Sequence, residues 1–150
     1  VTIGHFFGVE AEKIDKALNE YEPRNNRSQL KKTADNTLII DAYNANPTSM
    51  LAAIGNFRNM QAEKKMLILG DMRELGKDSA EEHQRIVDYL EEYGFEDVIL
   101  VGELFAATRH TYTTYPDAPA LIAALQKHKP CGKTILIKGS IKLNTVVDYL

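Results

Sequence analysis

The stretch TLIIDAYNANPTSM, residues 37–50, joins a short apolar strand to the start of a helix. Residues 37–41 form a nearly continuous apolar run rich in β-branched side chains, which is typical of a strand buried on both faces. Asn46 has the side chain of an N-cap residue, and Pro47 suits the first position of a helix. An apolar stripe at helical spacing follows, formed by Met50, Ile54, Phe57 and Met60. The stretch therefore predicts a buried strand that leads directly into an amphipathic helix.

The same alternation of apolar runs and amphipathic stretches continues on both sides of this segment. Further strands are predicted at residues 28–32, 65–69, 98–101 and 133–138. Further helices are predicted at residues 9–21, 79–93, 117–127 and 143–150, with a short helix and a short strand within 103–115. Alternating strands and helices indicate a mostly parallel sheet covered on both faces. We predict an α/β protein with a Rossmann-like three-layer α/β/α fold, in which a mostly parallel sheet of about six strands carries one antiparallel edge strand.

The length and composition describe one globular domain. The chain has 150 residues, of which 44% are hydrophobic and 26% charged. Its net charge of −3 argues against a nucleic-acid partner, and no apolar run approaches the roughly 18 residues that a membrane span needs. No secretory signal is present, and one cysteine, Cys131, excludes an internal disulfide framework. We expect a cytoplasmic protein without membrane insertion, and the start at Val1 favours a piece of a longer chain.

Several familiar motifs fail in this sequence. Residues 132–134 read GKT, but the glycine that a phosphate-binding P-loop requires five residues earlier is Lys127, and the segment enters a strand instead of a helix. The glycine patterns of dinucleotide-binding folds and of the nucleophile elbow are missing. The four histidines lack metal-ligand spacing, so no metal site is expected. We interpret His83 as a surface or capping histidine and Cys131 as an unreactive thiol.

Polar residues follow the predicted strands directly, at the strand ends where parallel sheets bind ligands. They are Asp41, Asp71, Gly102, Glu103 and residues 138–140. Any single one has an ordinary structural explanation, because a strand must end in something polar. As a set they would meet at one edge of the sheet, which favours a ligand site there.

The first segment with specific chemistry at this edge is residues 41–47, DAYNANP. The carboxylate of Asp41 can accept two hydrogen bonds from a ribose diol. The side-chain amides of Asn44 and Asn46 offer donors and acceptors without charge, so they can orient a peptide or a second carboxylate. This segment therefore predicts a site for a nucleotide, a peptide or both.

The second segment is residues 70–76, GDMRELG, which places two carboxylates between two glycines above the sheet. These carboxylates, Asp71 and Glu74, are candidates for ligand contacts. They are equally explained by a loop that caps the following helix, and we leave both interpretations open. That helix is predicted to open at Ser79, with Glu82 three residues later forming a capping box.

Taken together, these motifs resemble the C-terminal domain of the Mur ligase family. The matching runs, in the same order and spacing, are residues 41–50, 69–76, 79–83 and 138–140. Within the family, YNANP and GDMRELG are similar to the ligases that add a dipeptide, whose sister ligases usually carry His in the first run. The resemblance implies two regions, with residues 1–22 as the end of the central ATPase domain, a helix and hinge near residues 22–24, and residues 23–150 as the C-terminal domain.

The resemblance implies an activity in peptidoglycan precursor synthesis. ATP phosphorylates the carboxylate of UDP-MurNAc-tripeptide, and the amine of D-Ala-D-Ala attacks the resulting acyl phosphate. The expected partners are therefore ATP, D-Ala-D-Ala, UDP-MurNAc-tripeptide and the N-terminal and central domains of the same chain. ATP and Mg²⁺ are expected to be held mainly by the central domain. The domain alone is expected to be inactive, because positioning needs all the parts at once.

The resemblance also implies roles for single residues. Arg27 matches the family arginine that reaches the ATP phosphates, where a planar cation with several donors suits transferring phosphoryl charge. Asp41 matches the aspartate that holds the ribose hydroxyls. Residues expected on the D-Ala-D-Ala side, from their place at the strand ends, are Asn44, Asn46, Asp71, Lys138 and Ser140. No catalytic residue is expected within this domain alone.

The sequence departs from the family pattern at two positions. Ile141 stands where the family usually has Arg after the KGS run, so a phosphate or carboxylate contact from that position is in doubt. Asn26 stands where Gly often precedes the arginine matched by Arg27.

Two alternatives of other kinds share the predicted fold. A folylpolyglutamate synthase C-terminal domain has related chemistry, but it is not expected to carry the YNANP run. A receiver-type phospho-acceptor domain also places acids at strand ends and a lysine after its last strand, as Asp41, Asp71 and Lys138 do here. Ile40 precedes Asp41, however, so the acidic pair that opens a receiver site is missing.

Overall fold

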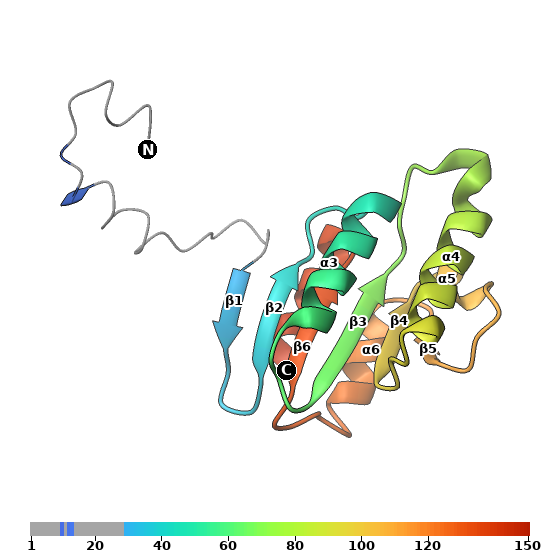
Figure 1. The fold of residues 1–150 in the computed structure, drawn as a ribbon. Coiled ribbons are helices and arrows are strands. Elements are labelled where there is room, and N and C mark those ends of the chain that lie inside the picture. Colours follow the sequence, from blue (N-terminus) through green and yellow to red (C-terminus); the bar gives the residue numbers. More distant parts are fainter. Residues whose placement is uncertain (1–9, 11, 14–28) are drawn as a thin grey trace.

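A computed structural model describes residues 10, 12, 13 and 29–150, and it shows one sheet between two layers of helices (Figure 1). The six strands run in the order β1-β2-β6-β3-β4-β5. The strands are β1 Gln29–Lys32, β2 Thr37–Asp41, β3 Lys65–Gly70, β4 Val98–Val101, β5 Thr113–Tyr115 and β6 Thr134–Lys138. The hinge near residues 22–24 and Arg27 lie outside the described residues, as does most of the helix predicted at residues 9–21.

The sheet is mixed in the way that the sequence predicts. β1 pairs with β2 antiparallel at one edge, and the other four pairings are parallel. β6, the last strand in the chain, inserts between β2 and β3. The predicted fold class is therefore confirmed, including the antiparallel edge strand.

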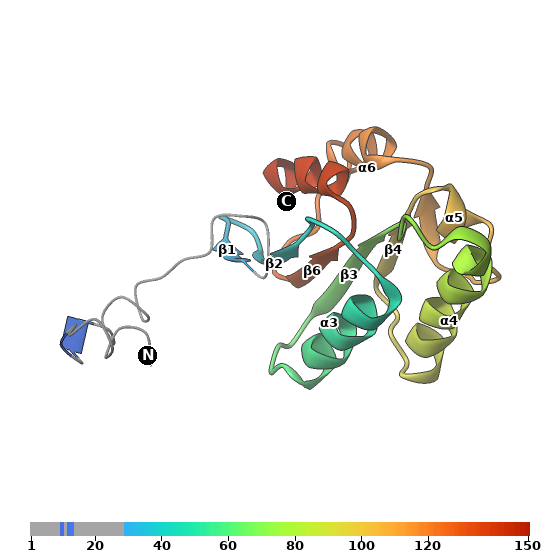
Figure 2. The ribbon, with the colours of Figure 1, turned by 90° about the horizontal axis from the view of Figure 1, so that it is seen from above.

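Helices cover both faces of the sheet (Figure 2). They are the α-helices α3 Pro47–Asn59, α4 Ser79–Glu92, α5 Glu103–Ala106 and α6 Ala118–Leu125, and the 3₁₀ helices η1 Gly76–Asp78 and η2 Ile141–Tyr149. α3 and α4 pack on one face, while α6 and η2 pack on the other. The last predicted helix is thus of the 3₁₀ type, and its four predicted apolar positions, Leu143, Val146, Val147 and Leu150, are all buried.

The strands serve two hydrophobic cores, because successive side chains of a strand point to opposite faces. In β3, Leu67 belongs to the core with Ile54 of α3 and Leu90 of α4. Its neighbour Ile68 belongs to the core with Val146 of η2. All five side chains are fully buried, so both layers hold the sheet in place.

Two local predictions about helix ends are wrong. Met60 is 42% exposed, because it is the C-cap of α3 and lies past the buried stripe. Ser79 and Glu82 form no capping box, because the 3₁₀ turn η1 runs straight into α4 and the amide of Ser79 already bonds to Gly76 O. An N-cap residue needs an extended backbone, and the residues that lead into α4 have a helical backbone instead.

The order of the strands opens a crevice at their carboxyl ends. The chain leaves β3 toward α4 on one face and leaves β6 toward η2 on the other. Adjacent parallel strands with exits of this kind form the point where open α/β sheets bind ligands. The backbones are tight there, since a Cβ added to Gly139 would lie 3.0 Å from the Cα of Gly70.

Candidate functional site

Two adjoining hollows lie at the carboxyl ends of the parallel strands. The larger has a volume of about 660 Å³ and is lined by the loops that follow β3, β4, β5 and β6. The smaller, of about 370 Å³, is lined on its other side by Tyr43 and Asn44. Five residues line both hollows, namely Asp71, Arg73, Glu74, Ser140 and Lys142. We call the combined space the carboxyl-edge cleft.

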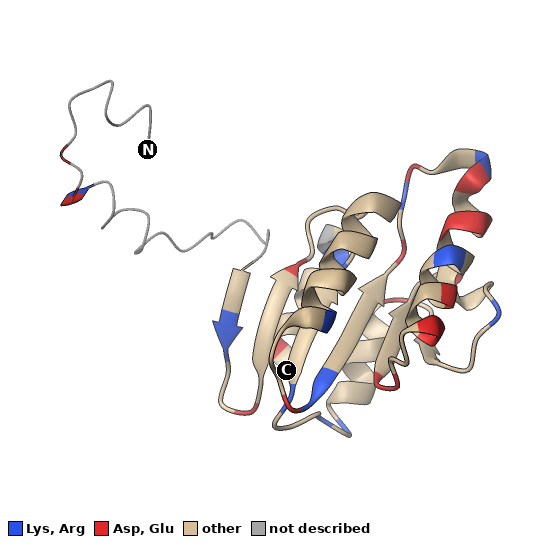
Figure 3. Ribbon diagram, viewed as in Figure 1, with Lys and Arg blue, Asp and Glu red and all other residues tan. Residues whose placement is uncertain are grey.

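The cleft carries charges of both signs. Figure 3 shows acidic and basic residues next to each other in the loop that follows β3. Arg73, Glu74 and Lys142 are exposed, so their charges are available to a ligand. Glu74 adopts a φ of +66°, which is uncommon for a residue with a Cβ and indicates that its surroundings hold this loop in place.

Asp71 connects the loop after β3 to the short helix α5. Its Oδ2 accepts a hydrogen bond from the amide of Leu104 at 3.1 Å, and its Oδ1 accepts one from Phe105 at 3.0 Å. Gly102 makes room for this contact, because a Cβ there would lie 2.1 Å from the Asp71 carboxyl carbon. Asp71 therefore does cap a helix, but the helix is α5 and not the following helix α4.

His83 is fully buried, so its interpretation as a surface or capping histidine is wrong. The amide of Met72 donates to Nε2 at 3.0 Å, which leaves the ring proton on Nδ1, 2.7 Å from the carbonyl oxygen of Ser79. The ring also packs edge-on against Phe105. The sequence does contain a signal for this burial, because His83 continues the helical stripe formed by Ile86, Val87 and Leu90.

Lys138 and Asp41 form an ion pair under the loop that joins β2 to α3. Lys138 Nζ lies 2.8 Å from Asp41 Oδ2 and donates to the carbonyl oxygen of Asn44 at 3.1 Å. The lysine side chain is 2% exposed and the aspartate side chain 23%. Neither residue lines the cleft, although Asn44 does.

The remaining predicted residues fall into two groups. Asn44 and Ser140 line the cleft, and the side chain of Asn44 also accepts a hydrogen bond from the amide of Ala45. Asn46 is the N-cap of α3, where it accepts from the amide of Ser49 at 2.8 Å. The structure therefore brings Asn44, Asp71 and Ser140 together and leaves Asn46 at the helix entry.

The cations of the cleft were not among the predicted site residues. Arg73 lies inside the recognised GDMRELG run, and Lys142 directly follows Ile141. Ile141 stands where the family usually has arginine, so the basic residue beside it, Lys142, was the signal in the sequence for a cation at this end of the sheet. Its place in the wall of both hollows shows that this end of the sheet retains a cation.

The described residues provide neither a metal cluster nor a membrane helix. Within residues 29–150 and the three described residues before them, no three His, Cys, Asp or Glu side chains are placed to hold a metal ion. In the same part of the chain, no helix is long and apolar enough to cross a membrane.

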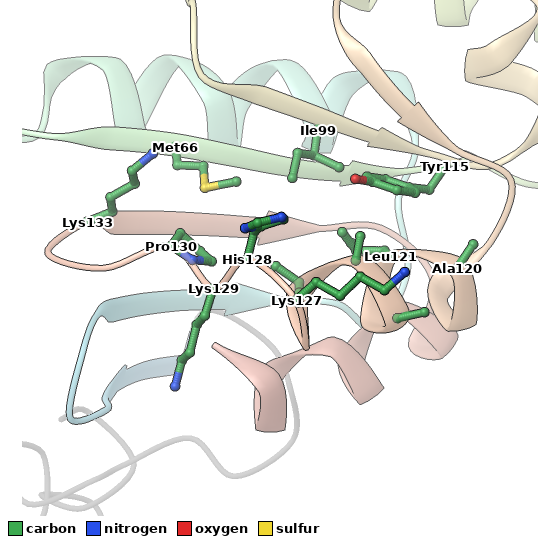
Figure 4. A pocket seen from close by; sticks show the side chains of 13 residues that line it. Met66, Ile99, Tyr115, Ala120, Leu121, Lys127, His128, Lys129, Pro130 and Lys133 are labelled. Carbon is green, nitrogen blue, oxygen red and sulfur yellow. The ribbon is translucent and has the colours of Figure 1, made fainter.

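A separate hollow of about 640 Å³ lies between α6 and the sheet (Figure 4). Its floor is apolar, with Met66, Ile99 and Tyr115 from the strands and Leu121 from α6. It contains none of the predicted site residues. The candidate site is therefore the carboxyl-edge cleft and the ion pair beside it.

The fold and the cleft define an open α/β domain whose candidate ligand site lies at the carboxyl ends of a parallel sheet. Comparison with known families specifies which one. Residues 26–141 match the Mur ligase, glutamate ligase domain, and the chain belongs to this family.

Three curated relatives share one name, UDP-N-acetylmuramoyl-tripeptide–D-alanyl-D-alanine ligase. The relative from Rickettsia prowazekii is 32% identical over 95% of this chain and 33% of its own length. The one from Bacillus subtilis is 33% identical over 100% of this chain and 36% of its own length. The one from Treponema pallidum is 40% identical over 89% of this chain and 31% of its own length. The chain thus spans about a third of the length of these relatives.

Solved structures agree with the sequence relatives. A MurF crystal structure from Acinetobacter baumannii has a TM-score of 0.71 and 30% identity, covering 95% of this chain and 33% of its own. The crystal structure of a MurF ligase from Thermotoga maritima in complex with ADP has a TM-score of 0.75 and 19% identity, covering 99% of this chain and 35% of its own. The latter supports the fold alone. The folylpolyglutamate synthase and receiver alternatives are not favoured by these relatives.

Proposed function

We propose that this chain is the C-terminal domain of a longer ATP-dependent ligase that adds D-Ala-D-Ala to UDP-MurNAc-tripeptide. The observation that carries the proposal is the shared name of relatives that match 89% to 100% of the chain. In this proposal residues 1–22 end the central ATPase domain, and residues 23–150 form the C-terminal domain. Because the proposed substrates are ATP and a UDP-linked precursor, the proposal includes a cytoplasmic location for the enzyme.

The proposed reaction has two steps. The carboxylate of the tripeptide takes the γ-phosphoryl group of ATP and releases ADP, and the dipeptide amine then displaces phosphate to form the new amide. Arg27 and Asp41 are the residues of this chain that we assign to ATP, because both match positions of the family pattern that contact the nucleotide. Mg²⁺ is assigned mainly to the central domain, as the resemblance to the family implies.

The carboxyl-edge cleft suits the incoming dipeptide. Free D-Ala-D-Ala is a zwitterion, with an ammonium group at one end and a carboxylate at the other. Arg73 and Lys142 provide cations for its carboxylate, and Glu74 provides an exposed anion for its ammonium group. Asn44 and Ser140 line the same space and can hydrogen-bond the peptide group.

The proposed function is tested with the full-length ligase that carries this chain at its C-terminus. Phosphate release from ATP is measured with UDP-MurNAc-tripeptide, in the presence and absence of D-Ala-D-Ala. We expect release that depends on the dipeptide, and a loss of about tenfold or more in kcat/KM for ATP in both Arg27→Ala and Asp41→Ala.

The isolated 150-residue chain serves as the control and should release no phosphate. Release that ignores the dipeptide would contradict the proposed reaction. Variants at Arg27 and Asp41 that match the wild type would contradict the nucleotide assignment.

A further inference from the structure

The place of Lys138 at a strand end suggested a contact to the dipeptide, but its burial favours another role. We propose that Lys138 is a positioning residue, whose buried ammonium group holds the Asp41 carboxylate in place for the ribose of the nucleotide. The inference rests on the proposed function, because it takes Asp41 as the residue that faces the nucleotide. It assigns Lys138 to the nucleotide side of the site and away from the dipeptide.

The burial of Lys138 is the first observation that supports this role. Lys138 is the only buried lysine or arginine among the residues whose burial is described, and its side chain is 2% exposed. Burying a cation is costly unless charged and polar partners surround it. A cation at 2% exposure is also poorly placed to reach a dissolved dipeptide, which separates it from the exposed Lys142.

The second observation is the geometry of the pair. Asp41 and Lys138 are register partners at the ends of β2 and β6, so their side chains project side by side from neighbouring strands. Lys138 Nζ contacts Oδ2 of Asp41 at 2.8 Å, while the Asp41 side chain keeps 23% of its surface exposed. The lysine therefore fixes the carboxylate from the protein side and leaves the other side open to a ligand.

The third observation is the second bond of the same ammonium group. Lys138 Nζ donates to the carbonyl oxygen of Asn44 at 3.1 Å, and Asn44 lines the carboxyl-edge cleft. One buried cation thus holds both the nucleotide-facing carboxylate and the loop that borders the proposed dipeptide site. A carboxylate that must accept two ribose hydrogen bonds benefits from being ionised and held in one orientation before the ligand arrives.

The test compares nucleotides that differ by one ribose hydroxyl. Equilibrium binding of ADP and 2′-deoxy-ADP to the full-length protein is measured by calorimetry, which needs no ligation. Wild type should prefer ADP by about tenfold, since a hydrogen bond to a carboxylate is lost with the 2′-hydroxyl. Asp41→Ala and Lys138→Met should both reduce this preference to about twofold or less.

Two further variants serve as controls for the test. Lys133→Met removes the ion pair with Asp97 at the opposite end of β6 and should keep the wild-type preference for ADP. In an Asp41→Ala background, Lys138→Met should cause no further loss of ADP affinity, because its effect passes through Asp41. This double variant buries no unpaired charge, so it remains informative if Lys138→Met alone folds poorly.

Three results would overturn the inference: a wild type without preference for ADP, a Lys138→Met variant that keeps the preference, or additive losses in the double variant. A Lys138→Met variant that instead raises only the KM for D-Ala-D-Ala would overturn the inference and indicate that Lys138 acts on dipeptide binding. If the ADP preference behaves as expected while phosphate release ignores the dipeptide, the proposed reaction fails and the role of Lys138 stands.

Discussion

At the scale of single residues, the cleft depends on one close contact between two loops. Asp71 reaches the amides of Leu104 and Phe105 only because Gly102 has no side chain. Gly102 also has a φ of +128°, which favours glycine. Both the missing Cβ and the backbone conformation are therefore needed for the loop after β3 to lie where it does.

Gly102→Ala should lower the free energy of unfolding by about 2–4 kcal/mol, because it adds both backbone strain and an overlap with the Asp71 carboxylate. Urea denaturation of the chain measures the loss. Gly132→Ala is the matched control, since Gly132 has a φ of +68° but no atom within 4 Å of an added Cβ. The control should lose only about 1–2 kcal/mol. Equal losses in the two variants would show that the overlap with Asp71 is relieved at no cost.

Lys142 tests the dipeptide side of the cleft. Lys142→Ala should raise the KM for D-Ala-D-Ala by about tenfold and leave the KM for ATP nearly unchanged, because a charge-assisted contact to the dipeptide carboxylate is lost. Steady-state phosphate release by the full-length ligase measures both constants. Lys127→Ala, at an exposed lysine beyond the end of α6, should change neither. An increase confined to the KM for ATP would indicate that Lys142 contacts the nucleotide and not the dipeptide.

At the scale of the elements, α3 shows how a helix start is encoded locally. Asn46 accepts from the amide of Ser49, and the Ser49 hydroxyl accepts from the amide of Asn46 in return. Pro47 follows at the first helical position. This reciprocal pair accounts for the side chain of Asn46 without a ligand, although Asn46 was predicted on the D-Ala-D-Ala side.

Substitution of Asn46 separates the two roles. Asn46→Ala should lower the free energy of unfolding by about 1 kcal/mol, because the amide of Ser49 loses its acceptor. Asn46→Asp keeps a capping oxygen and should keep the wild-type stability in the same urea experiment. We expect the KM for D-Ala-D-Ala to stay unchanged in Asn46→Asp. An increase there, at unchanged stability, would reveal a contact between the Asn46 amide and the dipeptide.

Most elements were predictable because their signals are local. The inner strands β2, β3, β4 and β6 follow from apolar runs, and the end of α4 follows from Gly94, which has a φ of +69°. The entry of α4 was mispredicted because Ser79 and Glu82 have the spacing of a capping box. Whether such a box forms depends on the backbone before it, and the 3₁₀ turn η1 replaces the extended N-cap residue.

At the scale of the whole molecule, the site is a product of strand order. β6 comes last in the chain but lies between β2 and β3, so Asp41, Asp71 and Lys138 arrive at one edge from three separate parts of the sequence. The chain spans about a third of its relatives, and the nucleotide side of the site is proposed to be completed by the other domains. In the same proposal, the cleft and the ion pair are the contribution of this domain to that shared site.

The sequence by itself determined the alternation of strands and helices, the fold class and the family, because periodicity and motif spacing are properties of neighbouring residues. It also predicted the edge of the sheet at which the candidate site lies. Only the tertiary structure decided which polar groups face a ligand and which face each other. The bond between Lys138 and Asn44 joins residues 94 positions apart, and that between Asp71 and Phe105 joins residues 34 apart. The partners of the buried His83 ring, Met72 and Phe105, likewise come from outside its own helix, so helical spacing could indicate the burial but not the contacts. Pairings of this kind depend on which strands become neighbours, and that is settled by packing of the whole chain.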